Sequence, residues 1–421
     1  MSTTVIPSAF AAKELLPATV LAVRGSLTDT VKTLRSLDPQ GLASHVDAVC
    51  DRVEAVEPQL RSLLPEARRR ERLQQEMAEL ARRYPETASR PPLFGAMLGV
   101  KDILKAADHP TRCGSALPPK LFADMEENAA VTRAKAAGAL VLGKTVTTEF
   151  ACSEPGATTN PWNPNHTPGG SSQGSAASLA AGLCQLSLGS QTGGSVNRPG
   201  AFCGITSFKA THGRIPANGC VMISNTLDHV GLFAPDVESM RLAAETIVND
   251  WQTDAPPPPA APVLGVPSGG SYLDKVDAAA LADFERTVAA LEEAGVQVKR
   301  VPLLDDVDEL SWAHLSVMRY EAAVANPGVH GTNGWWRDYA GLYRARTAEL
   351  ITKGLHTSEE DYAAGLAQRE TLRTTLASTA AEHCIDFWLT PGAPGECATL
   401  ACSRAFADAR DACPQAPRPA A

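Results

Sequence analysis

Three short segments of this sequence carry residue types that together could cleave an acyl compound. Two are rich in glycine and serine: GGSSQGS at residues 169–175 and GGSVNRP at residues 193–199. Glycines let the backbone approach a reacting carbonyl with consecutive N–H groups facing it, and a serine there can be a nucleophile. Serine needs a base near pH 7, and Lys101 can supply one if its apolar neighbours lower its pKa by burial. The pattern predicts acyl transfer at a serine.

Each segment alone also has a simpler interpretation. A stretch of glycine and serine is typical of a flexible linker, but both stretches adjoin strongly patterned segments, at residues 176–188 and 202–208. A lysine after an apolar run is often a solvated strand end. It is the three motifs together, in this order, that favour catalysis.

Residues 138–145, GALVLGKT, match the spacing of a phosphate-binding P-loop. Such a loop needs a strand before the first glycine, a polar stretch with free N–H groups, and a helix after the lysine. Here a predicted helix comes first, the intervening residues are apolar and strand-like, and residues 146–150 lack helical character. We therefore reject a nucleotide-binding site.

Residues 170–174, GSSQG, also fit the nucleophile elbow G-x-S-x-G, with Ser172 as the nucleophile. That elbow follows a buried strand, whereas NPWNPNHTP at residues 160–168 contains prolines that no interior strand tolerates. Histidines downstream leave a Ser-His-Asp triad formally open, and His229 is the one that most resembles a catalytic base. An isolated histidine is more often structural.

Composition narrows the class of protein. The chain has 421 residues, 44% of them hydrophobic, which is enough for a large core. Its net charge of −9 and the lack of a long Lys/Arg run argue against nucleic-acid binding. Residues 1–22 do not resemble a signal peptide, no apolar run has transmembrane length, and ten scattered cysteines favour reduced thiols. We expect a cytoplasmic protein, not bound to membranes, with a small-molecule substrate.

The chain divides into three parts by pattern. Residues 1–90 predict an N-terminal helical layer, residues 91–396 an α/β core, and residues 397–421 an atypical, disordered tail. Within the core, strands are predicted at 97–100 and 139–142, with a helix at 129–137 between them. A proline-rich connector at 254–262 precedes a strand, a helix and a strand at 263–266, 278–294 and 296–298, which could extend the same sheet. Residues 312–381 are mostly helical, and 387–391 form a strand end.

From about residue 93 to 394 the chain resembles the amidase signature family. The resemblance implies a single α/β/α domain with a large mixed sheet covered by helices, preceded by the helical layer. It is carried by GVKD at 99–102, GKT at 143–145, TPGGSS at 167–172, GSQTGGS at 189–195, FCG at 202–204 and GRIP at 213–216.

The resemblance also implies a catalytic triad of Lys101, Ser171 and Ser195. In this scheme Ser195 attacks the substrate carbonyl, Ser171 relays its proton, and a neutral Lys101 receives the proton and returns it to the leaving amine. A cis peptide bond precedes the bridging serine, water resolves the acyl-enzyme, and no metal or cofactor is required. The oxyanion hole is expected from the N–H groups of Thr192, Gly193 and Gly194, and loop support from Gly170, Ser172, Gln191 and Asn197.

The sequence departs from the family at two of these positions. The family often has Asp where Gln191 stands and Arg where Asn197 stands, so both charges are missing together. Neutralising both partners of a buried ion pair can be nearly free, whereas losing one costs about 3–5 kcal/mol. We therefore hypothesise that Gln191 and Asn197 hydrogen-bond each other beneath the nucleophile loop.

Three functions fit this sequence. The first is a cofactor-independent amidase acting on a small-molecule amide, for which a homodimer is conceivable. The second is the transamidating subunit of a glutamine-dependent amidotransferase, similar to the A subunit of glutamyl-tRNA amidotransferase, which needs a partner protein. The third is an inactive, truncated relic.

The third alternative rests on the C-terminal composition. Residues 397–421 contain nine alanines, three cysteines and three prolines, and no strand of the Leu-Pro-x-Gly-x-Gln type follows residue 391. An out-of-frame reading of a GC-rich gene would produce such a change. A sheet that lacks a strand exposes backbone and apolar surface, so we expect an aggregation-prone or weakly active polypeptide.

Overall fold

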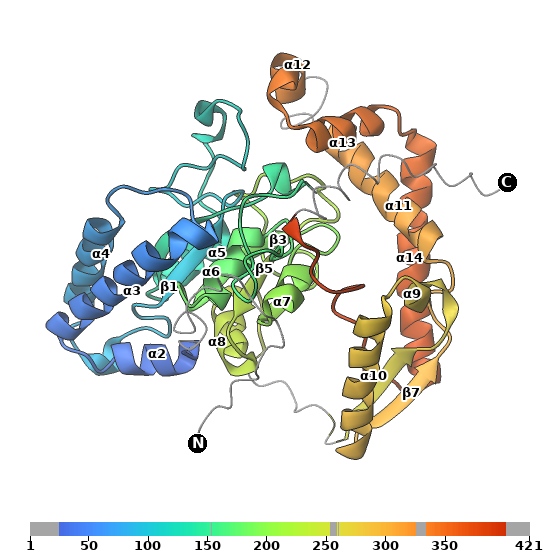
Figure 1. The fold of residues 1–421 in the computed structure, drawn as a ribbon, viewed down its shortest axis with the longest axis horizontal. Helices are drawn as coiled ribbons and strands as arrows, with labels where there is room; N and C mark the ends of the chain where they lie inside the picture. Colours follow the sequence, from blue (N-terminus) through green and yellow to red (C-terminus); the bar gives the residue numbers. More distant parts are fainter. Residues whose placement is uncertain (1–24, 153, 253–258, 260, 326–333, 401–421) are drawn as a thin grey trace.

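Two β-sheets organise the chain (Figure 1). The computed structural model describes residues 25–152, 154–252, 259, 261–325 and 334–400. The larger sheet has five strands in the order β2-β1-β3-β5-β4, and the smaller has three in the order β7-β6-β8. The strands are Met97–Lys101 (β1), Leu140–Thr145 (β2), Leu186–Gln191 (β3), Thr206–Lys209 (β4), His229–Ala234 (β5), Val263–Pro267 (β6), Gln297–Val301 (β7) and Phe387–Trp388 (β8).

The five-stranded sheet is mixed, as the sequence predicted. β1 runs parallel to β2 and β3, whereas β5 pairs antiparallel with β3 and β4. Every residue of β1, β2 and β3 is buried, which is expected of strands whose two faces are both covered. The strands predicted at residues 97–100 and 139–142 correspond to β1 and β2.

Helices cover both faces of this sheet. Leu140 and Leu142 on β2 enter one apolar core, shared with α3, α4 and α6, while Val141 enters the other, shared with α5 and α8. Adjacent side chains of a strand point to opposite faces, so the two cores make three layers and the predicted α/β/α class is confirmed. The helices are Leu27–Leu34 (α2), Pro39–Leu60 (α3), Arg69–Arg83 (α4), Ala129–Ala136 (α5), Gln173–Ala180 (α6), Asn197–Cys203 (α7) and Val237–Ile247 (α8), with short 3₁₀ turns at Thr87–Ser89, Pro119–Phe122 and Glu149–Ala151.

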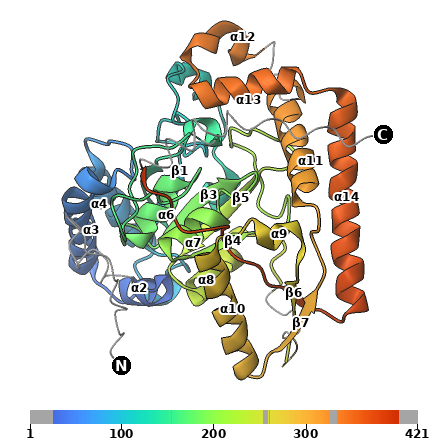
Figure 2. The same ribbon diagram turned by 45° about the vertical axis from the view of Figure 1, so that its right-hand side comes forward.

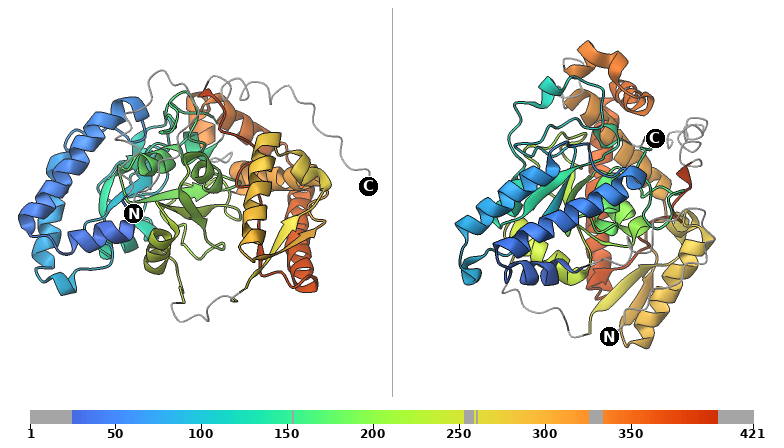
Figure 3. Two further views of the ribbon diagram at one scale, coloured as in Figure 1. Left: turned by 60° about the horizontal axis from the view of Figure 1, so that its bottom comes forward. Right: turned by 60° about the vertical axis from the view of Figure 1, so that its left-hand side comes forward.

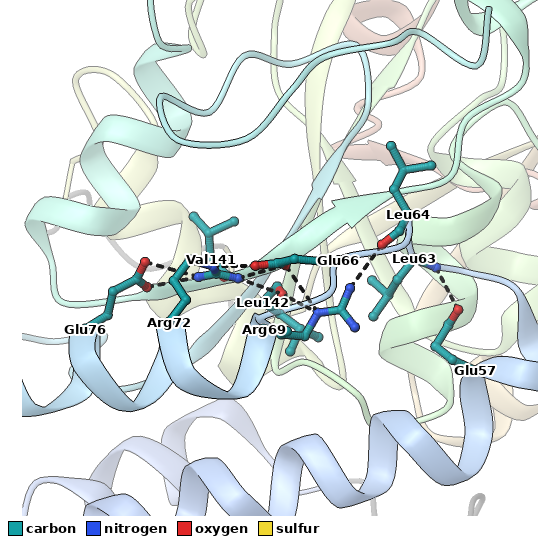
Figure 4. Close-up of polar contacts among 9 residues, drawn as sticks. All are labelled: Glu57, Leu63, Leu64, Glu66, Arg69, Arg72, Glu76, Val141 and Leu142. Carbon is teal, nitrogen blue, oxygen red and sulfur yellow. Dashed lines mark hydrogen bonds and ion pairs between the residues drawn. The ribbon is translucent and has the colours of Figure 1, made fainter.

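Helix α4 of the N-terminal layer lies along the outer strand of this sheet. β2 is an edge strand, and two of its carbonyl groups accept hydrogen bonds from α4: Arg69 Nε lies 3.1 Å from Leu142 O, and Arg72 Nη1 lies 2.9 Å from Val141 O (Figure 4). Covering a strand edge prevents it from pairing with another chain. The helical layer predicted for residues 1–90 is seen from residue 25 onward, where the description of the structure begins.

The C-terminal part forms a second lobe beside the central sheet (Figures 1 and 3). The expectation that its strands could extend the central sheet is wrong, because β6 pairs in parallel with β7 and β8 in a separate sheet. These three strands hydrogen-bond with one another. Phe284 and Val288 of α10 pack with Val266 in a small separate core. The helices of this lobe are Gly270–Asp274 (α9), Ala278–Glu293 (α10), Val307–Tyr320 (α11), Trp335–Tyr339 (α12), Ala345–Leu355 (α13) and Glu359–Glu382 (α14), with a π-helical turn at Glu321–Ala325 (η4) and a 3₁₀ turn at Ala340–Leu342 (η5).

The helical stretch predicted at residues 312–381 is present as α11 to α14, apart from residues 326–333, which lie outside the described part. α11 packs along α14 (Figure 2), and the rings of Tyr320 and Tyr362 stack with their centroids 4.4 Å apart. α11 lies on the side of the lobe that faces the central sheet. It is therefore placed to contact the loops that leave that sheet.

The predicted tail of residues 397–421 is described only to residue 400. Leu400 N donates to Asn165 O at 2.8 Å, and Thr167 N donates to Ala398 O at 3.0 Å. These residues therefore lie against the segment that leads into the first serine loop, whereas the rest of the tail and most of the proline-rich connector lie outside the described residues. In the described part of the chain, no helix is long and apolar enough to cross a membrane, and the described cysteines are free thiols.

Candidate active site

Lys101 ends β1 in the interior of the molecule. Its side chain is fully buried, and its Nζ lies 2.7 Å from Ser171 Oγ and 2.7 Å from Ser190 Oγ. Burial disfavours the charged ammonium and lowers the pKa of Lys101 to about 7. A lysine with a pKa near 7 is neutral in a large fraction of molecules at that pH, and one that touches a serine hydroxyl can exchange a proton with it.

Ser171 is held by its backbone on the first serine loop. The peptide bond between Gly170 and Ser171 is cis, and Ser171 O accepts a hydrogen bond from Thr148 N at 3.2 Å. Arg198, from the second serine loop, donates through Nη2 to Gly170 O at 2.7 Å. The two serine loops are thus tied together at the residue next to Ser171.

Ser172 has a different environment from its neighbour. It is fully buried at the start of α6, and its Oγ donates to Ser190 O at 3.1 Å and accepts from Ser190 N at 3.2 Å. A hydroxyl that both donates and accepts inside the fold supports the end of β3. This geometry speaks against the nucleophile elbow with Ser172.

Ser195 lies in the loop between β3 and α7 and is 9% exposed. The loop is held by Gln191, whose Oε1 accepts from Val196 N at 2.8 Å and from Asn197 N at 2.9 Å. Our hypothesis of a side-chain pair between Gln191 and Asn197 is therefore corrected. The amide of Gln191 reaches the backbone at the first turn of α7, where N–H groups lack helical partners, and the side chain of Asn197 is exposed.

Thr192, the first predicted oxyanion residue, is anchored by a buried carboxylate that the sequence analysis missed. Thr192 Oγ1 donates to Asp228, which also accepts from Ile223 N at 2.7 Å and from Ser224 N at 3.2 Å. Burial raises the pKa of the Asp228 carboxyl. No local sequence signal marks Asp228, because its place beside Thr192 follows from the pairing of His229 of β5 with Gln191 of β3.

The lysine of the P-loop-like motif has a structural partner. Lys144 is in β2, and its Nζ lies 3.1 Å from Asp102 Oδ1, with the two side chains 3% and 1% exposed. Lys144 also donates to Thr111 Oγ1 at 2.9 Å. Asp102 follows Lys101 directly, so this buried ion pair fixes the end of β1, and the strand character of the motif agrees with the rejection of a nucleotide site.

His229 is also accounted for by its surroundings. Its Nδ1 lies 2.6 Å from Leu227 O, and its ring packs edge-on against His212 at 5.0 Å. Burial lowers the pKa of His229 to about 4.

Within the described residues no group of three or more His, Cys, Asp or Glu side chains could hold a metal ion.

Comparison with known proteins shows a consistent pattern. A family model described as Amidase matches residues 44–404. The A subunit of glutamyl-tRNA(Gln) amidotransferase from Synechococcus sp. (strain RCC307) is 30% identical over 355 residues, which are 80% of this chain and 71% of that protein. Its counterpart from Synechococcus sp. (strain WH7803) is 43% identical over 192 residues, which are 44% of this chain and 39% of that protein. The chain thus spans less than half the length of some curated relatives that it matches.

Solved structures agree with the fold. A crystal structure described as an amidase is 27% identical, with a TM-score of 0.76 over 89% of this chain and 84% of that one. The native peptide amidase from Stenotrophomonas maltophilia is 22% identical, with a TM-score of 0.73 over 91% of this chain and 89% of that one. At that lower identity the likeness supports the fold alone.

Proposed function

Because this chain belongs to the amidase family, we propose that it cleaves a carboxamide through a seryl acyl-enzyme. The observation that carries the proposal is the 2.7 Å contact between the buried Nζ of Lys101 and Ser171 Oγ. A buried lysine with a lowered pKa next to a hydroxyl is a base that a serine nucleophile requires. Arg198 ties the loop of Ser171 to the loop that carries Ser195.

The proposed reaction moves one proton along this chain and back. Ser195 Oγ attacks the amide carbonyl, its proton passes through the Ser171 hydroxyl to neutral Lys101, and the C–N bond breaks as Lys101 returns the proton to the leaving amine. Water then attacks the ester of Ser195 by the same route and releases the acid. In the intermediate the negative oxygen accepts from the N–H groups of Thr192, Gly193 and Gly194, and one such donor typically lowers the barrier by about 3 kcal/mol.

Four further residues are proposed as loop support. The carbonyl oxygen of Gly170 accepts a hydrogen bond from Arg198, and the hydroxyl of Ser172 hydrogen-bonds the backbone of Ser190. Gln191 binds the loop after the nucleophile through Asn197 N. Their proposed effect is to hold the donors and the nucleophile in fixed geometry, on which an oxyanion hole depends.

A second candidate is favoured by the curated relatives. The two Synechococcus proteins reported above are described as subunits of glutamyl-tRNA(Gln) amidotransferases. In that role the amide would be that of glutamine, and the ammonia released would be used with a partner protein. The chemistry at Ser195 would be the same, so the two candidates differ in substrate and in the need for a partner.

Ammonia release separates the candidates. The purified chain is incubated with glutamine and with a panel of simple aliphatic and aryl amides, alone and with added amidotransferase partner subunits, next to Ser195→Ala. An amidase releases ammonia from simple amides without a partner, and an amidotransferase subunit releases it from glutamine when the partner and acceptor are present. Activity that persists in Ser195→Ala would contradict both candidates.

A further inference from the structure

A side chain of the second lobe lies against the proposed oxyanion loop. His314 is in α11, and a Cβ added at Gly193 would lie 3.3 Å from His314 Nε2. At the neighbouring Gly194 the nearest atom to an added Cβ is Arg198 Cβ, at 4.0 Å. The imidazole therefore lies against the loop at Gly193, whereas a Cβ added at Gly194 would meet no atom closer than 4.0 Å.

The position of His314 is fixed by the residue that follows α11. Glu321 is 1% exposed, and its carboxylate accepts from Thr226 N at 3.1 Å and Tyr362 OH at 2.9 Å, as well as from the hydroxyl of Ser224. Residues 223–228 also contain Asp228, the acceptor of Thr192. Helix α11, through Glu321, and the oxyanion loop, through Thr192, thus both bind the segment 223–228, which holds His314 next to Gly193.

The ring nitrogens of His314 offer a hydrogen-bond donor and an acceptor beside this loop. Neither of its ring nitrogens hydrogen-bonds a residue in the described part of the chain, although the ring is half-buried. Burial lowers the pKa of His314, so near pH 7 the ring is neutral, with one nitrogen as donor and the other as acceptor. Such a ring beside the loop binds an uncharged polar group better than a hydrocarbon, because an apolar group would leave its nitrogens unpaired.

We propose that His314 is a specificity-determining residue that hydrogen-bonds a polar group on the acyl part of the amide substrate. The inference rests on the proposed function, and it places the acyl substituent of an amide held at Gly193 N–H on the His314 side of the loop. It assigns the substrate to amides whose acyl group carries a hydroxyl, amino or carboxamide group close to the scissile carbonyl. Unsubstituted alkyl amides should be poorer substrates.

A matched pair of amides tests this inference. Lactamide and propionamide differ by one hydroxyl next to the carbonyl, and the ratio of their kcat/KM values is measured for the parent chain, His314→Leu and His314→Gln. The control is His356→Leu, since His356 is exposed at the end of α13. Titration of Ser195 with a fluorophosphonate gives the number of active sites in each preparation, so that misfolded protein is not counted.

We expect the parent to prefer lactamide, and the ratio to fall about tenfold in His314→Leu, as the loss of one hydrogen bond predicts. His314→Gln should restore part of the preference, and the control should leave it unchanged. An equal loss for both amides, or an unchanged ratio in His314→Leu, would overturn the inference while leaving the proposed function intact. A parent chain that is not labelled and hydrolyses neither amide would overturn both.

Discussion

Lys101 has two properties that a surface lysine lacks. It has no exposed surface, and its Nζ contacts the hydroxyls of Ser171 and Ser190 within the fold. Burial is the largest influence on its pKa, and it favours the neutral amine. The residue can therefore serve as a base at a pH where an ordinary lysine is charged.

The rate should follow the protonation of Lys101. Only the neutral amine can accept the proton of the serine relay, so kcat/KM should rise about tenfold per pH unit below the pKa of about 7 and level off above it. The measurement is a pH profile with a simple amide between about pH 5 and pH 9. A profile that is flat across this range would show that Lys101 is not the base.

Lys101→Met supplies an independent readout of the same pKa. A lysine whose pKa is lowered by folding binds fewer protons in the folded state than in the unfolded state, so it opposes folding most at low pH and least above its ordinary pKa. Removing it should abolish activity and raise the free energy of unfolding, more at pH 6 than at pH 9. Denaturant melts at the two pH values check this, and a loss of stability at pH 6 would contradict it.

Gln191 gives a residue-scale test of the corrected loop geometry. Its Oε1 accepts two backbone N–H groups at the start of α7, so Gln191→Leu should lower the free energy of unfolding by about 1–3 kcal/mol. Asn197→Ala is the matched control, because Asn197 contributes its backbone and its side chain is exposed. Equal losses in the two variants would favour the side-chain pair that we first hypothesised.

At this scale the sequence revealed some site residues and not others. Lys101 and Ser171 belong to dense local motifs, and they lie in contact. Ser190 and Asp228 act through partners that are distant in sequence, since they depend on how β1, β3 and β5 pair. Local patterns carry no information on such pairing.

At the scale of elements, the buried ion pair between Lys144 and Asp102 joins β2 to the end of β1. The two side chains are almost wholly buried, at 3% and 1% exposed. Lys144→Met leaves a buried carboxylate unpaired, and the expected cost is about 3–5 kcal/mol in the free energy of unfolding. Denaturant melts measure it.

A surface ion pair provides the control for this prediction. Arg82 and Glu79 form a pair on α4 in which the side chains are 74% and 51% exposed. Exposed pairs contribute about 0–1 kcal/mol, so Arg82→Met should change stability little. If Lys144→Met and Arg82→Met lost stability to the same extent, the ion pair between Lys144 and Asp102 would not be what fixes the end of β1.

The sequence predicted β1 and β2 of the central sheet and β6 and β7 of the small one, but it did not predict β3, β4 and β5 or how the strands are grouped. Apolar runs marked β1, β2 and β6, since buried strands read as continuous apolar stretches, whereas β7 has the sequence QVKRV and is partly exposed. The sequence did not reveal that β6 and β7 would form a sheet of their own with β8. That outcome depends on the contacts between α10 and Val266. Such contacts join residues that are distant in sequence, so no local pattern predicts them.

At the scale of the whole molecule, the apolar cores around the two sheets differ in size. The two cores of the central sheet contain many buried residues from helices on both faces. The core of the small sheet consists of Val266, Phe284 and Val288 with three half-buried neighbours. Regions with few buried apolar contacts open at lower free energy than the rest of a protein. The small sheet and α10 should therefore be the less stable part.

Hydrogen exchange tests this difference directly. Backbone amides of β6 and β7 should exchange faster than those of β1 and β3 under native conditions, because the smaller core opens without global unfolding. Peptides from α10 should follow β6, as both share the small core. Uniform protection across both sheets would instead indicate one cooperative unit.

The central claim is that Ser195 is the nucleophile and is activated through Ser171 and Lys101. The most direct measurement is labelling of the purified chain with a fluorophosphonate, followed by peptide mapping, with Ser195→Ala and Lys101→Ala as controls. We predict one covalent adduct, on Ser195, that is absent in Ser195→Ala and much slower to form in Lys101→Ala because the three residues act as a unit. An adduct on Ser172, or labelling of Ser195 at an unchanged rate in Lys101→Ala, would contradict the account.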